Sequence, residues 1–135
     1  MTNKINKKNE ITFRAWDKKR KIMEYDIELG KYDKNIPEIE NFIDYLIYPD
    51  YDVMEFTKVY DINGKKIYES DIIEIWEDNE KIIQEEVKWL PSFGGWNFSG
   101  YLIYNNLMKK FNKKIDLKVK GNIYENPDLL KNERK

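Results

Sequence analysis

Four acidic side chains near the middle of the chain have the types and spacing that could do chemistry. They are Asp61, Glu69, Asp71 and Glu74, in the stretch DINGKKIYESDIIEIW, residues 61–76. Clustered carboxylates could hold Mg²⁺ or Ca²⁺, because both ions prefer hard oxygen ligands. Their spacing matches no closed metal-binding loop. We favour an alternative in which Asp61 and Asp71 stand at turns, where their carboxylates accept hydrogen bonds from backbone N–H groups.

The composition excludes most familiar catalytic sites. The 135 residues include no histidine and no cysteine, so Ser-His-Asp and Cys-His catalysis, disulfides and thiolate metal sites are excluded. An enzyme would have to use carboxylates, lysine or tyrosine, each with a strongly shifted pKa at neutral pH. The sequence contains no Walker loop, Gly-x-Gly-x-x-Gly turn or EF-hand loop. We therefore expect a protein that is not an enzyme and that uses no cofactor or metal ion.

The balance of charge argues against a general affinity for nucleic acids or membranes. The chain has twenty-four basic and twenty-five acidic residues, which gives a net charge of −1. No overall field therefore attracts a polyanion. The basic clusters NKINKKNE and KKFNKK are best explained as solvated surface. Apolar runs such as YLIY fall far short of the roughly 20 residues that a membrane span needs. No apolar stretch follows the N-terminus MTNKINKKNE, so we expect no secretory signal and a cytoplasmic location.

Alternating apolar and polar residues predict several short strands divided by turns rich in Gly, Pro and Asn. The expected elements are a hairpin over 11–29, a strand over 51–57, a turn at 61–64, an extended piece over 65–71, a strand over 72–76, a hairpin loop at 77–80, and strands in 81–90, 96–104 and 115–124. In the first strand, Ile11, Phe13 and Ala15 should form the apolar face. A helix is expected from Ile36 to Leu46, although the YLIYP segment also suits a strand.

This pattern predicts a mainly β fold with minor α, in the form of a small barrel. The segment NNLMKKF, residues 105–111, should be helical or irregular. A further helix is expected after Asn126, which should cap it, with Pro127 at its first position. Aromatic residues make up 15% of the chain and can supply the core. The tryptophans expected to fill the barrel are Trp76, Trp89 and Trp96. The aromatic residues proposed to be exposed, and therefore candidates for binding, are Trp16, Tyr101 and Tyr104.

Three segments resemble the signature blocks of the YopX family, small proteins found mostly in phages and prophages of Gram-positive bacteria. They are ITFRAWDKKRKIMEY, VMEFTKVYDINGKKIYESDIIEI and GNIYENPDLL, which together span residues 11–130. The middle block is the most specific, with the family pattern Thr-Gly-x-x-Asp-x-x-Gly-x-x-Ile-Tyr-x-Gly-Asp-Ile. The matching residues here are Thr57, Asp61, Gly64, Ile67, Tyr68, Asp71 and Ile72, and Gly121 and Asn122 open the last block. Lys58 and Ser70 stand where the family usually has glycine, so the local loop geometry could differ.

The resemblance implies a small SH3-like barrel with short helical additions. It places one domain over residues 11–130, with a flexible arm at 1–10 and a polar tail at 131–135. It supplies no molecular function. Two classes therefore remain open. The favoured one is a non-enzymatic interaction module of a phage or prophage that binds a host or phage protein and forms a homo-oligomer. The alternative is a small barrel that binds nucleic acid or a nucleotide locally.

Overall fold

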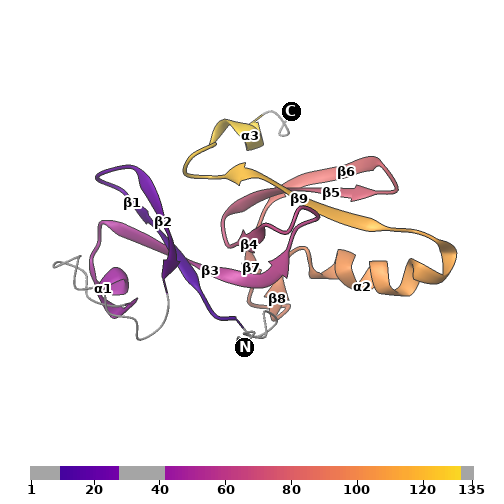
Figure 1. The fold of residues 1–135 in the computed structure, drawn as a ribbon, viewed down its shortest axis with the longest axis horizontal. Helices are drawn as coiled ribbons and strands as arrows, with labels where there is room; N and C mark the ends of the chain where they lie inside the picture. Colours follow the sequence, from indigo (N-terminus) through magenta and orange to yellow (C-terminus); the bar gives the residue numbers. More distant parts are fainter. Residues whose placement is uncertain (1–9, 28–41, 132–135) are drawn as a thin grey trace, which may run out of the picture. The chain divides into compact units, whose positions relative to one another are not determined.

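The computed structural model describes residues 10–27 and 42–131, and Figure 1 shows its ribbon. The described residues are mainly β with a few short helices, and strands curl into a half-barrel sheet, so the expected fold class is confirmed. The chain divides into two compact units, residues 1–59 and 60–135. The single domain over 11–130 stays a prediction. The arm at 1–10 and the tail at 131–135 lie almost wholly outside the described residues.

Unit 1 is a three-stranded antiparallel sheet with one helix. Its elements are β1 (Phe13–Asp17), β2 (Ile22–Ile27), α1 (Phe42–Ile47) and β3 (Tyr51–Tyr60). β1 lies between β2 and β3 and pairs with both. The predicted hairpin over 11–29 and the predicted strand over 51–57 are therefore confirmed where the chain is described.

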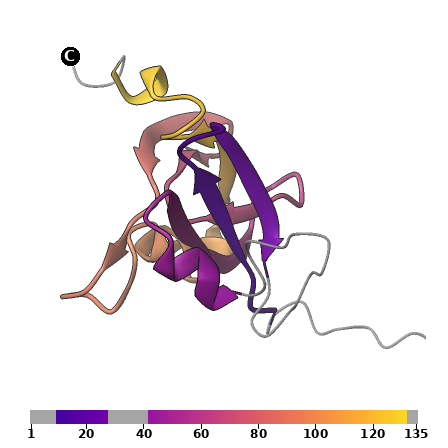
Figure 2. The ribbon, with the colours of Figure 1, turned by 90° about the vertical axis from the view of Figure 1, so that its left-hand side faces the viewer.

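The core of unit 1 forms where α1 packs on this sheet (Figure 2). Ala15, Ile27 and Tyr45 are buried together, and the Tyr45 ring meets the Tyr51 ring edge-on at 5.1 Å. α1 ends before Pro49, as expected, because the residue before a proline avoids helical geometry. The helical conformation of residues 42–47 decides between the two alternatives for YLIYP. The first part of the expected helix, residues 36–41, lies outside the described residues.

The apolar face predicted for the first strand is wrong in part. Ile11 is 50% exposed, whereas Thr12 and Arg14, expected on the opposite face, are each only 2% exposed. Both polar side chains have partners that make burial tolerable. The Thr12 hydroxyl donates to the Ile27 carbonyl at 3.4 Å, and Arg14 Nε lies 3.4 Å from the Met54 sulfur as a donor. Alternation alone cannot detect such partners, since they come from neighbouring strands.

Unit 2 contains two small sheets and most of the helical residues. Its elements are β4 (Lys66–Tyr68), β5 (Asp71–Glu77), β6 (Glu80–Glu86), β7 (Trp89–Leu90), β8 (Gly95–Trp96), α2 (Ser99–Met108), the 3-10 turn η2 (Lys109–Phe111), β9 (Ile115–Asn122) and α3 (Asp128–Lys131). One antiparallel sheet has the order β6-β5-β9, and β7 pairs with β8. In the central strand β5, Ile72, Ile73 and Ile75 are fully buried.

Tight reversals in unit 2 follow the predicted turn chemistry. The hairpin loop expected at 77–80 joins β5 to β6, and Asp78 and Asn79 adopt positive φ angles of 49° and 71°. Such a pair matches the right-handed twist of the flanking strands. Asn126 behaves differently from its predicted role as a side-chain cap of α3. Its Oδ1 instead accepts from the backbone N–H of Asn122 at 3.2 Å.

The strand predicted over 96–104 is wrong. β8 ends at Trp96, and residues 99–108 form the helix α2. The sequence WNFSGYLIY is rich in aromatic and branched residues, which suit a strand, but a short apolar run cannot be assigned by periodicity alone. Tertiary contacts decide here. Phe98 is fully buried just before α2, and Asn105 Oδ1 accepts from the N–H of Ile115 at 2.9 Å, which ties the helix to the start of β9.

The tryptophans do not fill the core as predicted. Trp89 is 48% exposed, and Trp76 and Trp96 are half-buried. Trp89 and Trp96 pair across β7 and β8 with ring centroids 5.2 Å apart. Trp76 donates from Nε1 to Glu74 at 3.0 Å, and Lys118 Nζ lies 4.4 Å from its ring. A large ring with a polar N–H is commonly left partly exposed, and the fully buried positions of unit 2 go to smaller side chains.

Across the described ranges, no helix has both the length and the apolar character to cross a membrane.

Candidate functional site

Asp61 organises the turn that follows β3. Its Oδ1 accepts from the backbone N–H groups of Asn63 and Lys65, both at 2.9 Å, and its Oδ2 accepts from Val119 at 3.0 Å. Gly64 sits in the same turn with a φ of 81°, a conformation that a residue without Cβ adopts easily. The carboxylate is 7% exposed. Asp61 therefore fixes the turn and joins it to β9, as the turn interpretation predicts.

Asp71 has a similar role at the start of β5. Its Oδ2 accepts from the backbone N–H of Tyr68 at 2.8 Å, and the residue is 2% exposed. Asp71 lies opposite Asn122 in the β5–β9 pairing. Asn122 Oδ1 in turn accepts from the N–H groups of Tyr124 and Glu125 at 3.0 and 2.8 Å. Both side chains are therefore engaged in shaping the backbone.

Gly121 owes its residue type to close packing. A Cβ at this position would lie 2.3 Å from Oδ1 of Asn126, the atom that bonds to Asn122. Any larger residue would displace the Asn126 side chain, because real Cβ contacts are never so short. Gly121, Asn122 and Asn126 thus form one structural unit at the end of β9.

The remaining signature residues are buried or bonded locally. Ile67, Tyr68 and Ile72 have exposures of 0 to 3%. Thr57 is 6% exposed, and its Oγ1 accepts from the N–H of Val59 at 3.2 Å.

Lys58 and Ser70, the two departures from the family pattern, keep the backbone shape that glycine would provide. Their φ angles are 70° and 72°, both in the left-handed region. Residues with a Cβ adopt this region at a cost of about 1 kcal/mol or more. The turn geometry is therefore retained at these two positions despite the side chains.

The acidic residues do not assemble into a metal centre. Within residues 10–27 and 42–131, no three side chains of the ligating types approach closely enough to hold a metal ion. Asp61 and Asp71 are engaged by backbone N–H groups, and Glu74 lies 3.8 Å from Lys81 Nζ. The carboxylates of Asp61 and Asp71, the candidate metal ligands of the sequence, therefore stabilise the local backbone.

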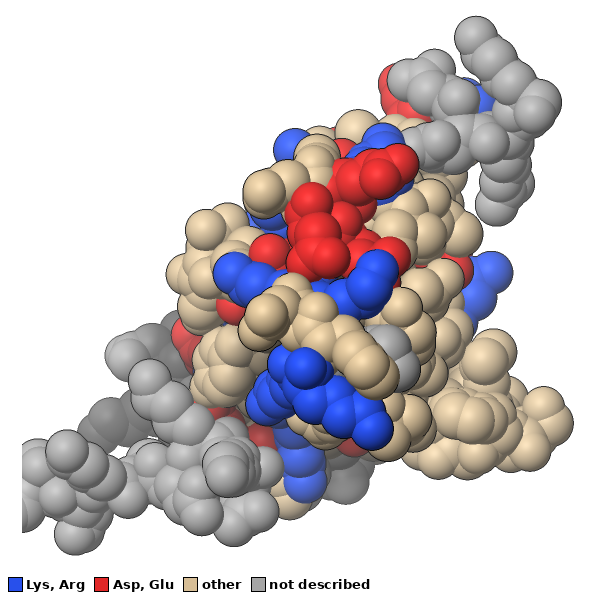
Figure 3. Space-filling view, turned by 90° about the vertical axis from the view of Figure 1, so that its right-hand side faces the viewer, with Lys and Arg blue, Asp and Glu red and all other residues tan. Residues whose placement is uncertain are grey.

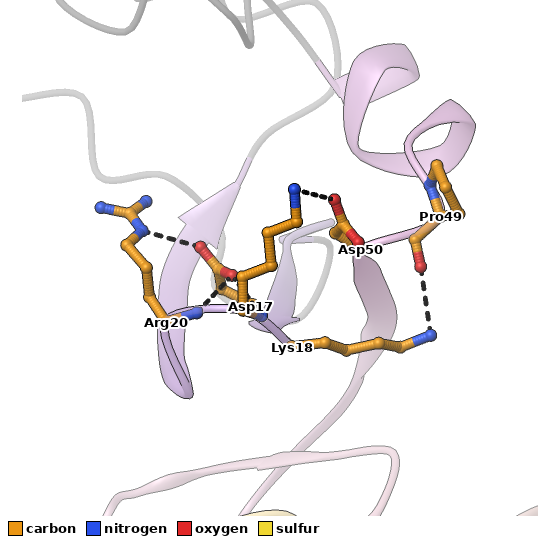
Figure 4. A network of polar contacts seen from close by, with 6 residues as sticks. Asp17, Lys18, Arg20, Pro49 and Asp50 are labelled. Atoms are coloured by element: carbon orange, nitrogen blue, oxygen red, sulfur yellow. Dashed lines mark hydrogen bonds and ion pairs between the residues drawn. The ribbon is translucent and has the colours of Figure 1, made fainter.

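A polar network in unit 1 is likewise structural (Figure 4). Asp17 is the last residue of β1, and its Oδ1 accepts from the N–H groups of Lys19 and Arg20, both at 3.0 Å, while Oδ2 accepts from Arg20 Nε at 2.8 Å. These contacts, led by the backbone bond from Arg20, hold the pKa of Asp17 below its usual value. Lys18 adds a bond from Nζ to the Pro49 carbonyl at 3.1 Å. The network joins the β1–β2 turn to the segment before β3.

The three aromatic binding candidates fall in different places. Trp16 lies half-buried in β1, opposite Met23 and Asp52 in the sheet of unit 1. Tyr101 and Tyr104 both lie on α2 in unit 2, where the first is half-buried and the second is 38% exposed. The structure therefore brings the two tyrosines together.

Tyr101 and Tyr104 line an open pocket of about 330 Å³ between α2 and the sheet. The other lining residues are Glu77, Ile82, Gly100 and Ile115. Tyr104 donates from its hydroxyl to Glu77 Oε2 at 2.8 Å, and this hydrogen bond is the largest cause of a raised pKa of Tyr104. The phenol is accordingly a hydrogen-bond donor at neutral pH and a poor base. The pocket offers aromatic and aliphatic walls with one carboxylate, which suits an apolar or aromatic group carrying a positive charge.

An exposed apolar stripe continues from this pocket along α2. Ile103, Leu107 and Phe111 are 58, 61 and 58% exposed. A spacing of four residues places Ile103 and Leu107 on one side of α2, and Phe111 follows in the turn η2. The sequence of α2, SGYLIYNNLM, contains no charged residue. We call the pocket and this stripe the α2 face.

Charged side chains adjoin the α2 face in the sequence, and Figure 3 shows acidic and basic side chains in separate neighbouring patches on one side of the molecule. Lys109, Lys110, Lys113 and Lys114 are exposed next to Phe111 in the sequence. The N–H of Lys114 donates to Asp78 Oδ1 at 3.0 Å, which places this basic segment beside the β5–β6 turn. Lys110 Nζ lies 5.2 Å from the centre of the Phe111 ring.

Sequence reasoning identified Tyr101 and Tyr104 but missed the rest of the α2 face. Glu77, Ile82 and Ile115 come from three different strands, so no local pattern joins them to the helix. The first part of the helix was predicted as a strand and only residues 105–111 as helical or irregular, which hides the spacing of Ile103 and Leu107 along one helix. A helical reading of residues 99–104 as well would have revealed the stripe.

Comparisons with known proteins concern both the fold and the family. The crystal structure of protein EF1440 from Enterococcus faecalis superposes with a TM-score of 0.55 and 22% sequence identity, covering 90% of this chain and 98% of that chain. This likeness shows a shared fold. No curated protein matches the chain. Residues 12–131 match the sequence model of the YopX protein family. Since this match covers most of the chain and contains the signature residues described above, the chain belongs to the YopX family.

Proposed function

We propose that the chain is a non-enzymatic protein-interaction module, a phage or prophage accessory protein that acts in the cytoplasm of a bacterial host. The α2 face is its docking surface. The observation that carries the proposal is the 58 to 61% exposure of Ile103 and Leu107 on the uncharged helix α2 and of Phe111 in the adjoining turn η2. Single exposed apolar residues are ordinary, but a contiguous apolar surface marks an interaction site.

Covering a large apolar side chain completely contributes about 1.5–3 kcal/mol, so three such residues supply a useful share of a binding free energy even after the cost of association. The adjoining pocket adds concave walls from Tyr101 and Tyr104. Aromatic anchors in pockets are typical of the residues that dominate protein interfaces.

The chemistry of the same surface supports binding in preference to catalysis. The chain has no histidine or cysteine. The polar pair in the pocket, Tyr104 and Glu77, is a hydrogen-bonded donor and acceptor, and the raised pKa of Tyr104 leaves its hydroxyl protonated at neutral pH. A general base would need a pKa near the working pH.

Site-specific photo-cross-linking tests the docking surface. The photoreactive amino acid p-benzoylphenylalanine replaces Phe111, and the purified protein is irradiated in a lysate of the bacterial host. We expect discrete protein adducts that disappear when Leu107→Lys is added, because the lysine disrupts the apolar stripe. Phe93 is 57% exposed outside the α2 face, and the same probe there serves as the matched control. Equal labelling at both positions, or no adduct at position 111, would reject the proposal.

Nucleic-acid binding is the second candidate, and the exposed lysines beside Phe111 are the observation that favours it. Aromatic rings flanked by cations are the usual means of holding single strands. The near-neutral chain and the acidic patch next to the lysines weaken this alternative. We expect binding to random DNA at about 150 mM salt to be weaker than the roughly 10⁻⁴–10⁻⁶ M of non-specific binders. Tighter binding that is lost in Lys110→Glu would favour this alternative.

A further inference from the structure

We infer that the α2 face pairs with the α2 face of a second copy of the chain, so that Phe111 of each copy enters the Tyr101–Tyr104 pocket of the other. This inference rests on the proposed function and names its partner. It makes each pocket incomplete until the other copy contributes a side chain. The arrangement is a two-fold symmetric dimer, in which the same surface is used on both sides.

Helix geometry brings the required groups together when two α2 helices cross antiparallel at Leu107. Each residue four positions from the crossing point lies about 6 Å along the axis, at 1.5 Å per residue. Ile103 and Tyr104 of one copy therefore face the η2 turn of the other, which carries Lys110 and Phe111. Leu107, the most exposed residue of the stripe at 61%, meets its own copy at the symmetry axis. The absence of charge from residues 99–108 leaves no like-charge repulsion along this contact.

The group presented by one copy matches the pocket of the other in shape and charge. Phe111 carries the ammonium of Lys110 at 5.2 Å from its ring centre. The pocket has two phenol rings and the carboxylate of Glu77. Aromatic rings favour edge-to-face or offset contacts with one another, and the lysine would neutralise the carboxylate at the pocket rim. A volume of about 330 Å³ accommodates a phenyl ring.

The Tyr104–Glu77 hydrogen bond prepares the pocket for this occupant. It fixes the Tyr104 hydroxyl on Glu77 Oε2 at 2.8 Å, so the arriving ring does not bury an unpaired phenol. The cost of burying an unsatisfied polar group is thereby avoided. Removing the hydroxyl in Tyr104→Phe should weaken pairing less than removing the ring that enters the pocket.

Cysteine cross-linking tests the crossing point directly, because the chain has no native cysteine. Under mild oxidation at micromolar concentration, Leu107→Cys should form a disulfide-linked dimer, since the two copies of this residue face each other. Ile62→Cys is the control, at a position that is 46% exposed and lies outside the α2 face. Failure of Leu107→Cys to exceed this control would overturn the proposed crossing.

Sedimentation equilibrium of the unlabelled chain measures how much the Phe111 side chain contributes to the dimer affinity. Phe111→Ala should raise the dimer Kd about tenfold or more, as expected for an aromatic anchor, whereas Phe93→Ala should leave it unchanged. Both residues are more than half exposed, so neither variant should fail to fold. A strict monomer, or a dimer that is insensitive to Phe111→Ala, would reject the inference. Photo-adducts at position 111 with other proteins alone would reject self-pairing while supporting the proposed function, and no adducts would reject both.

Discussion

The turns that carry the signature residues differ from the α2 face in what their side chains contact. Asp61, Asp71 and Asn122 direct their side-chain oxygens to backbone N–H groups within the chain. On the α2 face, large apolar side chains such as Leu107 extend outward without cover from the described residues. Polar groups that are satisfied internally stabilise a fold, whereas uncovered apolar groups gain free energy only from a partner.

This difference separates what the family shares from what is available for binding. The three signature segments cover residues 11–25, 53–75 and 121–130, and α2 lies outside all of them at 99–108. The signature therefore describes a scaffold. Substitutions that remove the side-chain acceptors of the signature turns should lower stability and leave association intact in the folded fraction. Substitutions on the α2 face should weaken association and leave stability intact.

Asp61→Ala should have the largest effect on stability. The substitution removes the acceptor for three backbone N–H groups at 2.9 to 3.0 Å, so we expect a loss of about 2–4 kcal/mol in the free energy of unfolding. Urea denaturation measures it. Asp61→Asn keeps one acceptor oxygen but turns an amide toward a donor. Its free energy of unfolding should fall between those of the unchanged protein and of Asp61→Ala. A loss below 0.5 kcal/mol in Asp61→Ala, the range of ordinary surface substitutions, would show that the turn does not depend on this carboxylate.

Asp71→Ala should follow with a loss of about 1–2 kcal/mol, the scale of one carboxylate-to-backbone hydrogen bond. The bond to the Tyr68 N–H at 2.8 Å is the contact removed. Sedimentation of the folded fraction should show unchanged association. Full stability combined with lost association would erase the distinction between scaffold and docking surface, because it would make Asp71 part of a binding site.

The sequence predicts the scaffold better than the docking surface for a physical reason. The roles of Asp61 and Asp71 depend on partners a few residues away, so local turn chemistry was sufficient to anticipate them. The pocket depends on Ile82 and Ile115, which reach α2 only through the pairing of β5 with β6 and β9. That pairing is decided by tertiary packing. The exposure of Trp89 was missed for the same reason, since residue type alone does not say which face of a short strand is covered.

Ser70→Gly should stabilise the protein modestly. Ser70 has a φ of 72°, and glycine removes the strain of a Cβ in the left-handed region while adding freedom to the unfolded chain. The net gain should be about 0.5–1 kcal/mol, measured by the urea midpoint. Lys58→Gly, at a φ of 70°, should behave alike. Ser99→Gly is the control, because it lies in α2 and should destabilise. A loss in both signature variants would mean that these side chains make contacts worth more than the strain.

The smallest expected effect is the pH dependence of the stability that Asp17 contributes to the β1–β2 turn. This prediction tests whether a turn of unit 1 is stabilised in the same way as the signature turns. Backbone bonds and Arg20 lower the pKa of Asp17 in the folded state. Its contribution is therefore complete above the ordinary aspartate pKa of 3.8 and is lost as the pH falls through the lower folded-state pKa. Asp17→Asn should cost about 0.5 kcal/mol at pH 7, the scale of an exposed ion pair. Subtracting the free energy of unfolding of Asp17→Asn from that of the unchanged protein at each pH reduces the background from other carboxyl groups. That difference should shrink toward zero in acid, and a gap that stays constant down to the pH of acid unfolding would show that the charge of Asp17 contributes nothing to the turn.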